Sequence, residues 1–511
     1  MAHDALLAEL ERRRAAGRAM GGPEKLAKRE ERGQLNAMER LDALVDKGSF
    51  IELGVLGASG IFDEDVSATP RDGKITGFAK IDGRDVGVVF NDFTTKGAST
   101  SATNSKKMGY VRRACTEQGM PFVHIGESTG ARLPDAMGSK GMGQLLGNDI
   151  TQFRRMRDTP WVAAALDTSF GSSAWQCCCA DFAVMKKGSI MSVSSPRLVS
   201  MAIGEKVDLE ELGGWRLHAD QTGLIDHFVD TDEEAMAAIR RFLSYMPSHN
   251  GTLPPVAPVP EGAGEGQERI LEVLPEKRTQ VYNMKKIIEV IFDPDTFLEL
   301  KPRFGRSAVV GLARLAGKAV GIIANNPAVG GGALSADGCR KCVDFTVLCD
   351  SFNVPLVRMI DTPGFVVGTD AERRGAPGHI MNFMNATCLT TVPQVTVIAR
   401  KAYGRAYVAM GGGVHNDSIV AWPMAEVSFM DPVFATNIVH NLSPGKEGFD
   451  EALEHIQKDT EVWDMARIFS AHDIIKPQET RDYLIRMFDI HCRGRSGGIG
   501  QHLMRTWPTS Y

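Results

Sequence analysis

Short apolar runs that stop abruptly at turn residues give the clearest structural signal in this chain. Phe122-Val-His-Ile-Gly126 runs into Glu127-Ser-Thr-Gly130, and Val357-Arg-Met-Ile360 runs into Asp361-Thr-Pro-Gly364. Runs of about four to eight apolar residues bounded by turn signals are typical of buried strands in a parallel sheet. Because ligands of open α/β sheets bind beyond the carboxyl ends of the strands, each turn predicts the edge of a binding site.

The two stretches belong to an internal repeat. At an offset of 234 residues, 122–130 align with 356–364, and 77–87 align with 311–321 without a gap. Further along the chain the offset becomes 233, which places Gly171 on Gly404. The chain is therefore predicted to contain one α/β domain twice.

Helical spacing of apolar residues marks the segments around the predicted strands. Residues 5–45 show this spacing on either side of Gly21-Gly22-Pro23, which predicts two helices that form an outer clamp or a partner-facing arm. A further helix is expected from about residue 105 to residue 119, and closing helices are expected over residues 450–492.

A stretch rich in proline and glycine, residues 247–266, separates the two halves. Such a composition is typical of a linker. We therefore expect an N-terminal domain over residues 1–260 and a C-terminal domain over residues 261–511.

Composition and charge narrow the class of protein. The chain has 511 residues, of which 43% are hydrophobic and 24% charged, which is ordinary globular material with room for two large cores. A net charge of −5 without a long basic block disfavours nucleic acid as a partner. No run approaches the roughly 18 apolar residues of a membrane span, and the first residues lack the order of a secretion signal. We expect a cytoplasmic protein that does not bind membranes.

The cysteines pose a separate question because Cys339 and Cys342 form a Cys-x-x-Cys pair. A zinc site normally needs a second pair of ligands at similar spacing, and none follows. Residues three apart also share one face of a helix, which favours two buried cysteines in a core. We expect no metal site in this chain.

Side chains that could act as catalysts are scarce. The sequence has no Gly-x-Ser-x-Gly, His-Glu-x-x-His, Walker A or Gly-x-Gly-x-x-Gly motif, and its histidines, His124 among them, are scattered and interpreted as structural residues. Each half instead repeats a turn after a strand and a second turn that begins a helix. These pairs are Thr129-Gly130 with Ser172-Ser173, and Gly364-Phe365 with Arg405-Ala406.

Free backbone N–H groups at turns and helix N-termini stabilise negative charge that develops on oxygen, each by about 3 kcal/mol in a transition state. An enolate or a ureido oxygen suits such donors. The alternative is that the Gly and Ser residues serve only tight strand-to-helix turns. The pairing of the motifs across a duplicated chain favours the functional interpretation.

Several motifs resemble those of the carboxyltransferase β subunits of biotin-dependent acyl-CoA carboxylases, the propionyl-CoA/acetyl-CoA carboxylase group. They span nearly the whole chain and are specific in combination. The stretches are Gly33-Gln-Leu-Asn-Ala-Met-Glu-Arg-Leu41, Glu127-Ser-Thr-Gly-Ala-Arg132, Glu210-Glu-Leu-Gly-Gly214, Asp361-Thr-Pro-Gly-Phe365, Arg400-Lys-Ala-Tyr-Gly404, Ala421-Trp-Pro-Met-Ala-Glu426 and Ile474-Ile-Lys-Pro-Gln-Glu-Thr-Arg481.

The resemblance implies an α/β fold of two tandem crotonase-like (ClpP/crotonase) domains related by internal duplication. Acyl-CoA is then expected on the first half of one subunit, and carboxybiotin against the second half of a neighbour, within a homo-hexamer built as a trimer of dimers. The carboxyl group passes from biotin to the α-carbon of the thioester. Biotin itself is expected on a partner α subunit that contains the biotin carboxylase and the biotin carboxyl carrier, because this chain has neither.

The resemblance also assigns the site residues. It implies that Thr129-Gly130 and Arg405-Ala406 supply the catalytic N–H pairs. The residues expected to bind substrate are Ala131, Arg132, Ser172, Ser173, Gly364, Phe365, Gly404 and Val408.

Three stretches depart from the family pattern. Thr129 replaces a glycine in the first turn. Arg405 replaces a glycine, and Val408 an aspartate that helps to choose the acyl group, in the second stretch. Phe429-Met-Asp-Pro-Val433 replaces the family's Ala-Lys-Gly-Ala-Val. Because of Val408, we expect an unusual preference for the acyl group. The alternative role of Arg405 is to bind a substrate carboxylate. Two further functions stay open, namely a biotin-dependent decarboxylase or transcarboxylase subunit and a non-catalytic assembly subunit of the same fold.

Overall fold

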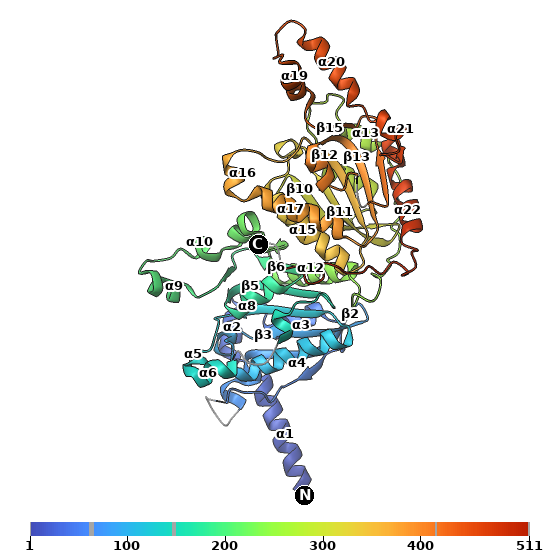
Figure 1. Cartoon of the computed structure of the whole chain (residues 1–511). Helices are drawn as coiled ribbons and strands as arrows, with labels where there is room; N and C mark the ends of the chain where they lie inside the picture. Colours follow the sequence, from blue (N-terminus) through green and yellow to red (C-terminus); the bar gives the residue numbers. More distant parts are fainter. Residues whose placement is uncertain (1, 61–65, 146–149, 414–415, 509–511) are drawn as a thin grey trace. The chain divides into compact units, whose positions relative to one another are not determined.

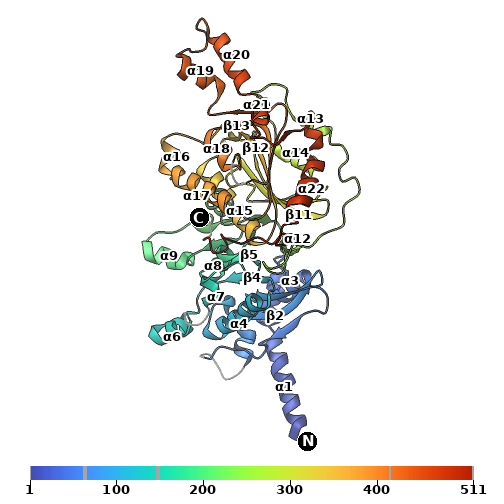
Figure 2. The ribbon, with the colours of Figure 1, turned by 45° about the vertical axis from the view of Figure 1, so that its right-hand side comes forward.

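The computed structural model describes residues 2–60, 66–145, 150–413 and 416–508. Within it the chain forms two compact units, Met1–Asn250 and Gly251–Tyr511. Figures 1 and 2 show both units as ribbons from two directions. Each unit is an α/β structure built on one central sheet, and each is described by itself below.

The sheet of the first unit has 8 strands among the described residues, in the order β1-β2-β3-β4-β5-β6-β8, with β7 paired to the end of β5. The strands β1, β2 and β3 pair antiparallel, and the others pair parallel. The strands are β1 (Ile51–Leu53), β2 (Lys74–Ile81), β3 (Arg84–Asn91), β4 (Phe122–Ser128), β5 (Trp161–Phe170), β6 (Phe182–Lys186), β7 (Ile190–Ser192) and β8 (His227–Val229).

Helices cover both faces of this sheet. Phe182 stacks on Phe242 of α12 with ring centroids 4.4 Å apart, whereas the next residue, Ala183, packs with Ala174 of α8. Since successive strand residues point to opposite faces, α12 and α8 lie on opposite sides. The helices are α1 (Ala2–Arg18), α2 (Pro23–Glu30), α3 (Ala37–Leu44), α4 (Ala102–Gln118), α5 (Leu133–Ala136), α6 (Gly138–Leu145), α7 (Ile150–Phe153), α8 (Ser172–Cys179), α9 (Pro196–Ile203), α10 (Leu209–Gly213), α11 (Trp215–Leu217) and α12 (Asp232–Tyr245).

Capping residues explain where the N-terminal helices differ from the prediction. The helix expected from about residue 105 begins at Ala102, because the Ser101 side chain accepts a hydrogen bond from the Asn104 N–H at 3.1 Å. Residues 5–45 hold three helices, not two. The third helix starts after Asn36, which forms a capping box with Glu39, a signal that the hydrophobic spacing alone does not show.

The second unit repeats the architecture of the first. Its 8 strands among the described residues follow the order β16-β14-β13-β12-β11-β10-β9, with β15 paired to the end of β13. The strands are β9 (Leu298–Leu300), β10 (Ala308–Leu315), β11 (Lys318–Asn325), β12 (Leu356–Thr362), β13 (Gln394–Tyr403), β14 (Ser418–Ala421), β15 (Glu426–Ser428) and β16 (Asp473–Ile474). Gly321 pairs with Leu356 as Gly87 pairs with Phe122, so the register follows the offset seen in the sequence.

The helices of the second unit include the closing helices predicted over residues 450–492. The full set is α13 (Arg269–Val273), α14 (Met284–Ile291), α15 (Ala336–Ser351), α16 (Thr369–Arg373), α17 (Ala376–Leu389), α18 (Gly404–Ala409), α19 (Pro432–His440), α20 (Phe449–Asp459), α21 (Trp463–Arg467) and α22 (Thr480–His491).

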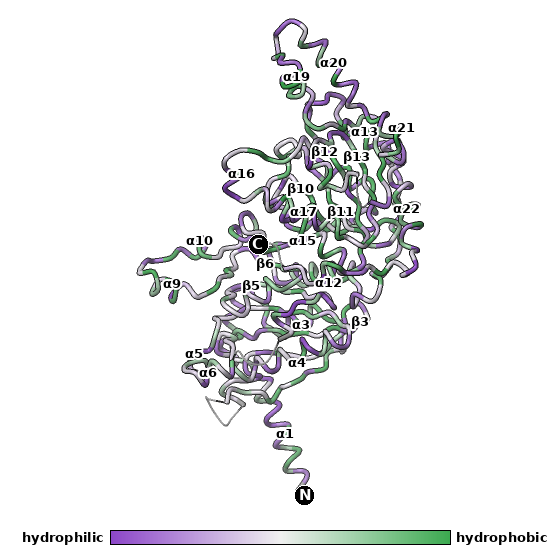
Figure 3. The backbone as a smooth tube through the Cα atoms, in the orientation of Figure 1, coloured by the Kyte–Doolittle hydropathy of each residue, from purple (hydrophilic) through white to green (hydrophobic). Residues whose placement is uncertain are grey.

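The core of the second unit forms because its central strands are apolar on both faces. Figure 3 shows β10 to β13 as a hydrophobic block, with hydrophilic segments at the periphery. Val357 and Met359 of β12 pack in one cluster with α14 and α22. Cys339 and Cys342 are both fully buried in α15, as their spacing predicted. In the part of the chain that the structure describes, no helix is long and apolar enough to cross a bilayer.

Candidate active site

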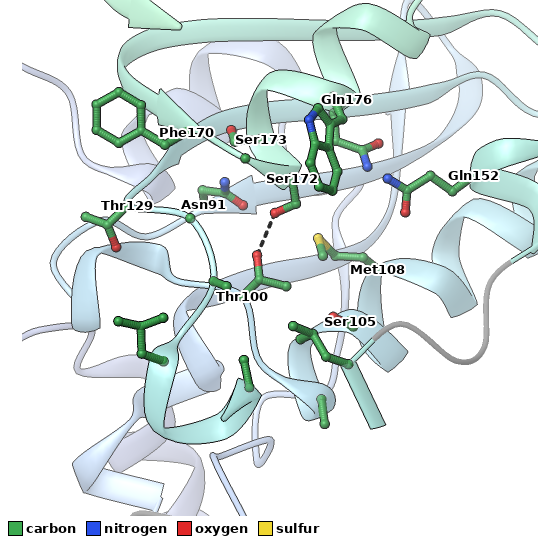
Figure 4. Close-up of a pocket in the computed structure, with 18 of the residues that line it drawn as sticks. Asn91, Thr100, Ser105, Met108, Thr129, Gln152, Phe170, Ser172, Ser173 and Gln176 are labelled. Atoms are coloured by element: carbon green, nitrogen blue, oxygen red, sulfur yellow. Dashed lines mark hydrogen bonds between the residues drawn. The ribbon is translucent and has the colours of Figure 1, made fainter. Parts of the chain in front are cut away.

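A cavity of about 1180 Å³ opens in the first unit, between α4, α8 and the turn that follows β4. Thr129, Gly130 and Ala131 line it from that turn, and Ser172 and Ser173 line it from the start of α8 (Figure 4). The fold thus brings together two motifs that lie more than 40 residues apart in sequence. The repeated sequence pattern predicted that this turn and the start of this helix lie together.

The start of α8 leaves its first N–H groups available. Gly171 adopts φ 58° and ψ −120°, a conformation that L-residues rarely reach, and this turns the chain sharply from β5 into the helix. The earliest hydrogen bond at this end runs from the Trp175 N–H to the Gly171 carbonyl at 3.1 Å. Within the described residues, the N–H groups of Ser172 and Ser173 donate to no protein acceptor. They are the orphan donors of a helix N-terminus.

The turn after β4 offers a single free donor. The Thr129 N–H donates to the Gly97 carbonyl at 3.0 Å, and the Gly130 N–H donates to Ser128 Oγ at 3.1 Å. Around Ala131, the Thr100 N–H donates to the Gly130 carbonyl, and the Arg132 N–H donates to the Thr100 carbonyl, each at 2.8 Å. Between these two bonds, the Ala131 N–H has no acceptor among the described residues.

The roles predicted for Thr129 and Gly130 therefore stay a prediction, but this loop already uses their N–H groups. Ala131, which the resemblance assigns to substrate binding, carries the donor that is open in this turn. Its side chain is exposed and it lines the cavity.

A hydrogen bond between side chains joins the two parts of the site. Thr100 Oγ1 and Ser172 Oγ lie 2.6 Å apart, as the dashed line in Figure 4 marks. Thr100 also bridges to Ala131 through the backbone. The segment that contains Thr100 is thus bonded to both donor-bearing turns and holds them at a fixed separation.

The second unit repeats the free donors at equivalent positions. Gly404 adopts φ 59°, and in the described part of the chain the N–H groups of Arg405 and Ala406 at the start of α18 have no acceptor. The Gly364 N–H donates to Thr362 Oγ1 at 3.2 Å, as Gly130 does to Ser128. The Phe365 N–H, like that of Ala131, has no acceptor among these residues.

Two substituted side chains of the second unit can be placed as well. Arg405 is exposed and forms no ion pair with any described residue, so its guanidinium is available to an anion. Val408 is half-buried on α18. Neither observation tests the role predicted for the residue.

The acidic residue before the first turn is structural. Glu127 is fully buried and paired with Arg29 at 2.8 Å and with Arg40, which also pairs with Asp232 at 2.7 Å. Burial alone would raise the pKa of Glu127, but the Arg40 and Arg29 charges outweigh it and lower the pKa. Glu127 therefore stays ionised and anchors the strand end, too enclosed to act as a base.

Arg132 has a similar structural function. Its guanidinium pairs with Asp72 and donates to the Ser99 carbonyl at 3.1 Å, and the side chain is almost fully buried. It is absent from the cavity wall. The arrangement fixes the chain on the far side of the turn and leaves Arg132 little freedom to contact a substrate.

The sequence did not reveal the inner wall of the cavity. Lys74, Asn91, His124 and Gln176 line it although the strand residues among them lie in otherwise apolar segments. His124 was interpreted as a structural residue with its partners satisfied, yet Nδ1 has no hydrogen-bond partner in the described structure. The feature of the sequence that could have indicated this polar wall is the presence of a lysine and a histidine within buried strands.

The combined geometry stabilises oxygen anions through the backbone. A thioester carbonyl that reaches the Ala131 and Ser172 N–H groups gains hydrogen bonds as its oxygen becomes negative, without help from an acidic side chain. A helix N-terminus adds a favourable dipole. This is the chemistry needed to form an enolate at the α-carbon of a thioester.

Comparisons with known proteins agree with this geometry. The carboxyl transferase domain family matches residues 28–496. The propionyl-CoA carboxylase beta chain of Roseobacter denitrificans is 34% identical over 494 residues, which cover 94% of this chain and 96% of that protein. The methylmalonyl-CoA decarboxylase subunit alpha of Veillonella parvula is 30% identical over 473 residues and covers 92% of each chain.

Solved structures extend the likeness to the fold. The transcarboxylase 12S hexamer with methylmalonyl-coenzyme A and methylmalonic acid bound superposes with a TM-score of 0.89 at 29% identity, over 96% of both chains. The predicted fold class, two crotonase-like domains, is thereby confirmed. The chain belongs to the carboxyl transferase family and is a carboxyltransferase subunit of the acyl-CoA carboxylase type.

Proposed function

We propose that this chain moves a carboxyl group between carboxybiotin, which a partner subunit carries, and the α-carbon of an acyl-CoA thioester bound in the cavity of the first unit. The observation that carries the proposal is the set of unpaired N–H groups at Ala131 and Ser172, repeated at Phe365 and Arg405. One set holds the thioester oxygen, and the other suits the ureido oxygen of biotin. Carboxybiotin supplies the carboxyl group when it is bound.

Each donor has a distinct task in this proposal. The Ala131 and Ser172 N–H groups stabilise the enolate oxygen of the acyl group. The N–H group of Phe365 and those of Arg405 and Ala406 at the start of α18 hold the biotin oxygen, and the helix N-terminus favours the negative charge that develops there. This assignment places acyl-CoA on residues 1–260 and biotin on residues 261–511.

The assembly is proposed to be a homo-hexamer, a trimer of dimers, in the cytoplasm, together with an α subunit that bears biotin carboxylase and the biotin carboxyl carrier. Exposed apolar side chains support extensive subunit contacts. In the first unit Met137 is 70% and Val193 78% exposed, and in the second unit Val367 is 86% and Phe429 78% exposed. Contact with another subunit would bury apolar surface of this kind, whereas Met137 and Val193 also line the cavity.

The test is the transfer of radiolabelled carboxyl from methylmalonyl-CoA to free biotin and to a biotinylated carrier protein. The proposal expects labelled biotin and unlabelled propionyl-CoA, with no need for ATP. Binding of acyl-CoA without any transfer to either acceptor would instead favour a non-catalytic assembly subunit.

A decarboxylase is the second candidate, because the Veillonella parvula relative is named a methylmalonyl-CoA decarboxylase subunit. The same half-reaction serves both directions, so the transfer assay does not separate them. Co-purification from the native cell does: a biotin carboxylase partner supports carboxylation, and a biotin carrier without a biotin carboxylase supports the reverse reaction.

A further inference from the structure

The inner wall of the cavity in the first unit is polar although it lies deep in the structure. His124 and Ser173 are each only 2% exposed, and both line the cavity. In the described structure, neither His124 Nδ1 nor Ser173 Oγ has a hydrogen-bond partner. Buried polar atoms are nearly always paired in native proteins, so these two atoms on one wall are available to the polar atoms of a ligand that fills the cavity.

These two groups lie next to each other. A Cβ atom placed on Gly126 would come within 2.5 Å of Ser173 Oγ and 3.0 Å of His124 Cε1. His124 and Gly126 occupy alternate positions of β4 and therefore point to the same face of the sheet. The absence of a side chain at Gly126 leaves the space in which Ser173 and His124 approach each other.

Gln176 extends this polar wall. It lies one turn after Ser173 on α8 and thus on the same face of the helix. Its side chain is 5% exposed, lines the cavity and makes no hydrogen bond with the described residues. Figure 4 shows Ser173 and Gln176 on the same helix, with Asn91 on a strand of the sheet.

The wall begins directly beside the oxyanion donors. Ser172 supplies a free N–H at the start of α8, and the next residue, Ser173, supplies the unpaired hydroxyl. A thioester whose carbonyl reaches the Ser172 N–H would therefore place the first carbons of its acyl chain near Ser173 and His124. An alkyl chain at this point would leave both polar atoms without partners.

The uncharged imidazole on this wall suits a neutral partner better than a carboxylate. Burial, together with the nearby charges of Lys74 and Arg112, holds the pKa of His124 well below its usual range, so the imidazole is uncharged. Lys74 Nζ already donates to Asn91 Oδ1 at 2.8 Å and to the Ala98 carbonyl at 2.9 Å, and burial lowers the pKa of Lys74 to about 7, so it carries only part of a positive charge at neutral pH. Arg112 donates to Gln152 Oε1 at 3.2 Å.

We propose that the cavity selects a short acyl group that bears a neutral oxygen substituent, a hydroxyacyl or oxoacyl thioester, whose oxygen hydrogen-bonds to Ser173 and His124. This inference rests on the proposed function, since it takes the cavity to be the acyl-CoA site. It names the chemical class of the substrate, which neither the fold nor the family assigns.

Calorimetric titration of the full chain with three thioesters of equal chain length tests the inference. Butyryl-CoA is the alkyl probe, 3-hydroxybutyryl-CoA the neutral oxygenated probe, and succinyl-CoA the anionic probe. One matched hydrogen bond predicts that 3-hydroxybutyryl-CoA binds about tenfold more tightly than butyryl-CoA. Equal or tighter binding of butyryl-CoA, or tightest binding of succinyl-CoA, would overturn the inference and leave the proposed function standing. Failure of all three to bind would overturn both.

Two variants test whether the polar wall causes the preference for 3-hydroxybutyryl-CoA over butyryl-CoA. Ser173→Ala keeps the backbone donor and removes only the hydroxyl, so the ratio of the two dissociation constants should fall from about ten towards one. Ser189→Ala is the matched control, because Ser189 is also a buried serine with an unpaired hydroxyl but lies outside the cavity wall. Its ratio should stay at the value of the parent chain. A loss of affinity for both thioesters in Ser173→Ala, with the ratio unchanged, would contradict the assigned contact.

Discussion

Thr100 Oγ1 and Ser172 Oγ lie 2.6 Å apart and link the segment after β3 to the first residue of α8. Because Thr100 also bridges to Ala131, this one contact couples the free N–H groups of Ala131 and Ser172. The donors themselves are backbone atoms, which no substitution removes except proline. The site therefore depends on how precisely the surrounding segments are held.

Loss of the contact between Thr100 and Ser172 should loosen this arrangement. Thr100→Val keeps the shape of the side chain and removes the hydroxyl, so the free energy of unfolding should fall by about 1 kcal/mol. The KM for the acyl-CoA should rise because Ser172 is less well positioned. Urea unfolding and steady-state transfer kinetics measure the two effects. Thr116→Val is the control, because Thr116 is a half-buried threonine on α4 whose hydroxyl bonds to its own helix. A variant with the stability and the KM of the parent chain would show that the Thr100 hydroxyl does not position Ser172.

The backbone at Arg405 should matter more than its side chain. Arg405 is the second residue of α18, a place where proline is tolerated because the N–H has no partner within the helix. Arg405→Pro should lower the carboxyl-transfer rate constant by about 100-fold to 1,000-fold with little change in thermal stability.

Arg405→Ala is the matched control, because it keeps the N–H and removes the guanidinium. It should retain a rate close to that of the parent chain. A large loss of activity in Arg405→Ala would support the alternative role, in which the guanidinium binds a substrate carboxylate.

The Glu127 network should contribute stability that depends on pH. Glu127→Gln leaves Arg29 without a charge partner and Arg40 with Asp232 alone, so the free energy of unfolding should fall by about 3 kcal/mol at pH 7. The pKa of Glu127 is lowered in the folded state, so this contribution is complete above the unfolded pKa of about 4.3 and is lost as the pH falls towards the folded value.

Urea titrations at a series of pH values check this expectation. The stability difference between the parent chain and Glu127→Gln should narrow as the pH falls below about 4.3. Glu24→Gln removes an exposed carboxylate that pairs with Lys28 on the same helix, and it should change nothing measurable. A difference that stays constant with pH would show that Glu127 acts through packing alone.

Val408 should influence the choice of acyl group. The resemblance places it where the family carries an aspartate near the acyl pocket, and the side chain is half-buried near the end of α18. Val408→Asp should shift the relative rates with propionyl-CoA and butyryl-CoA measured in the same transfer assay. An acyl-CoA profile identical to that of the parent chain would remove Val408 from the set of specificity residues.

The sequence alone determined the duplication, the two sheets and the places where strands end in ligand-facing turns. These features are local: apolar runs of strand length and the glycines that follow them repeat at a fixed offset, and residues 122–130 and 356–364 show it directly. It also indicated that helices begin around Ser172 and Arg405, because a glycine precedes each of them after a predicted strand.

Only the tertiary structure decided which donors are free and what the cavity wall presents. The Thr129 N–H donates to the Gly97 carbonyl, a contact between distant segments that no local pattern encodes. The N–H without an acceptor in this turn is that of Ala131. The polar pair of His124 and Ser173 likewise exists only because Gly126 leaves room where β4 and α8 meet. Hydrogen-bond partners and unfilled polar atoms depend on residues distant in sequence, and packing brings those residues together.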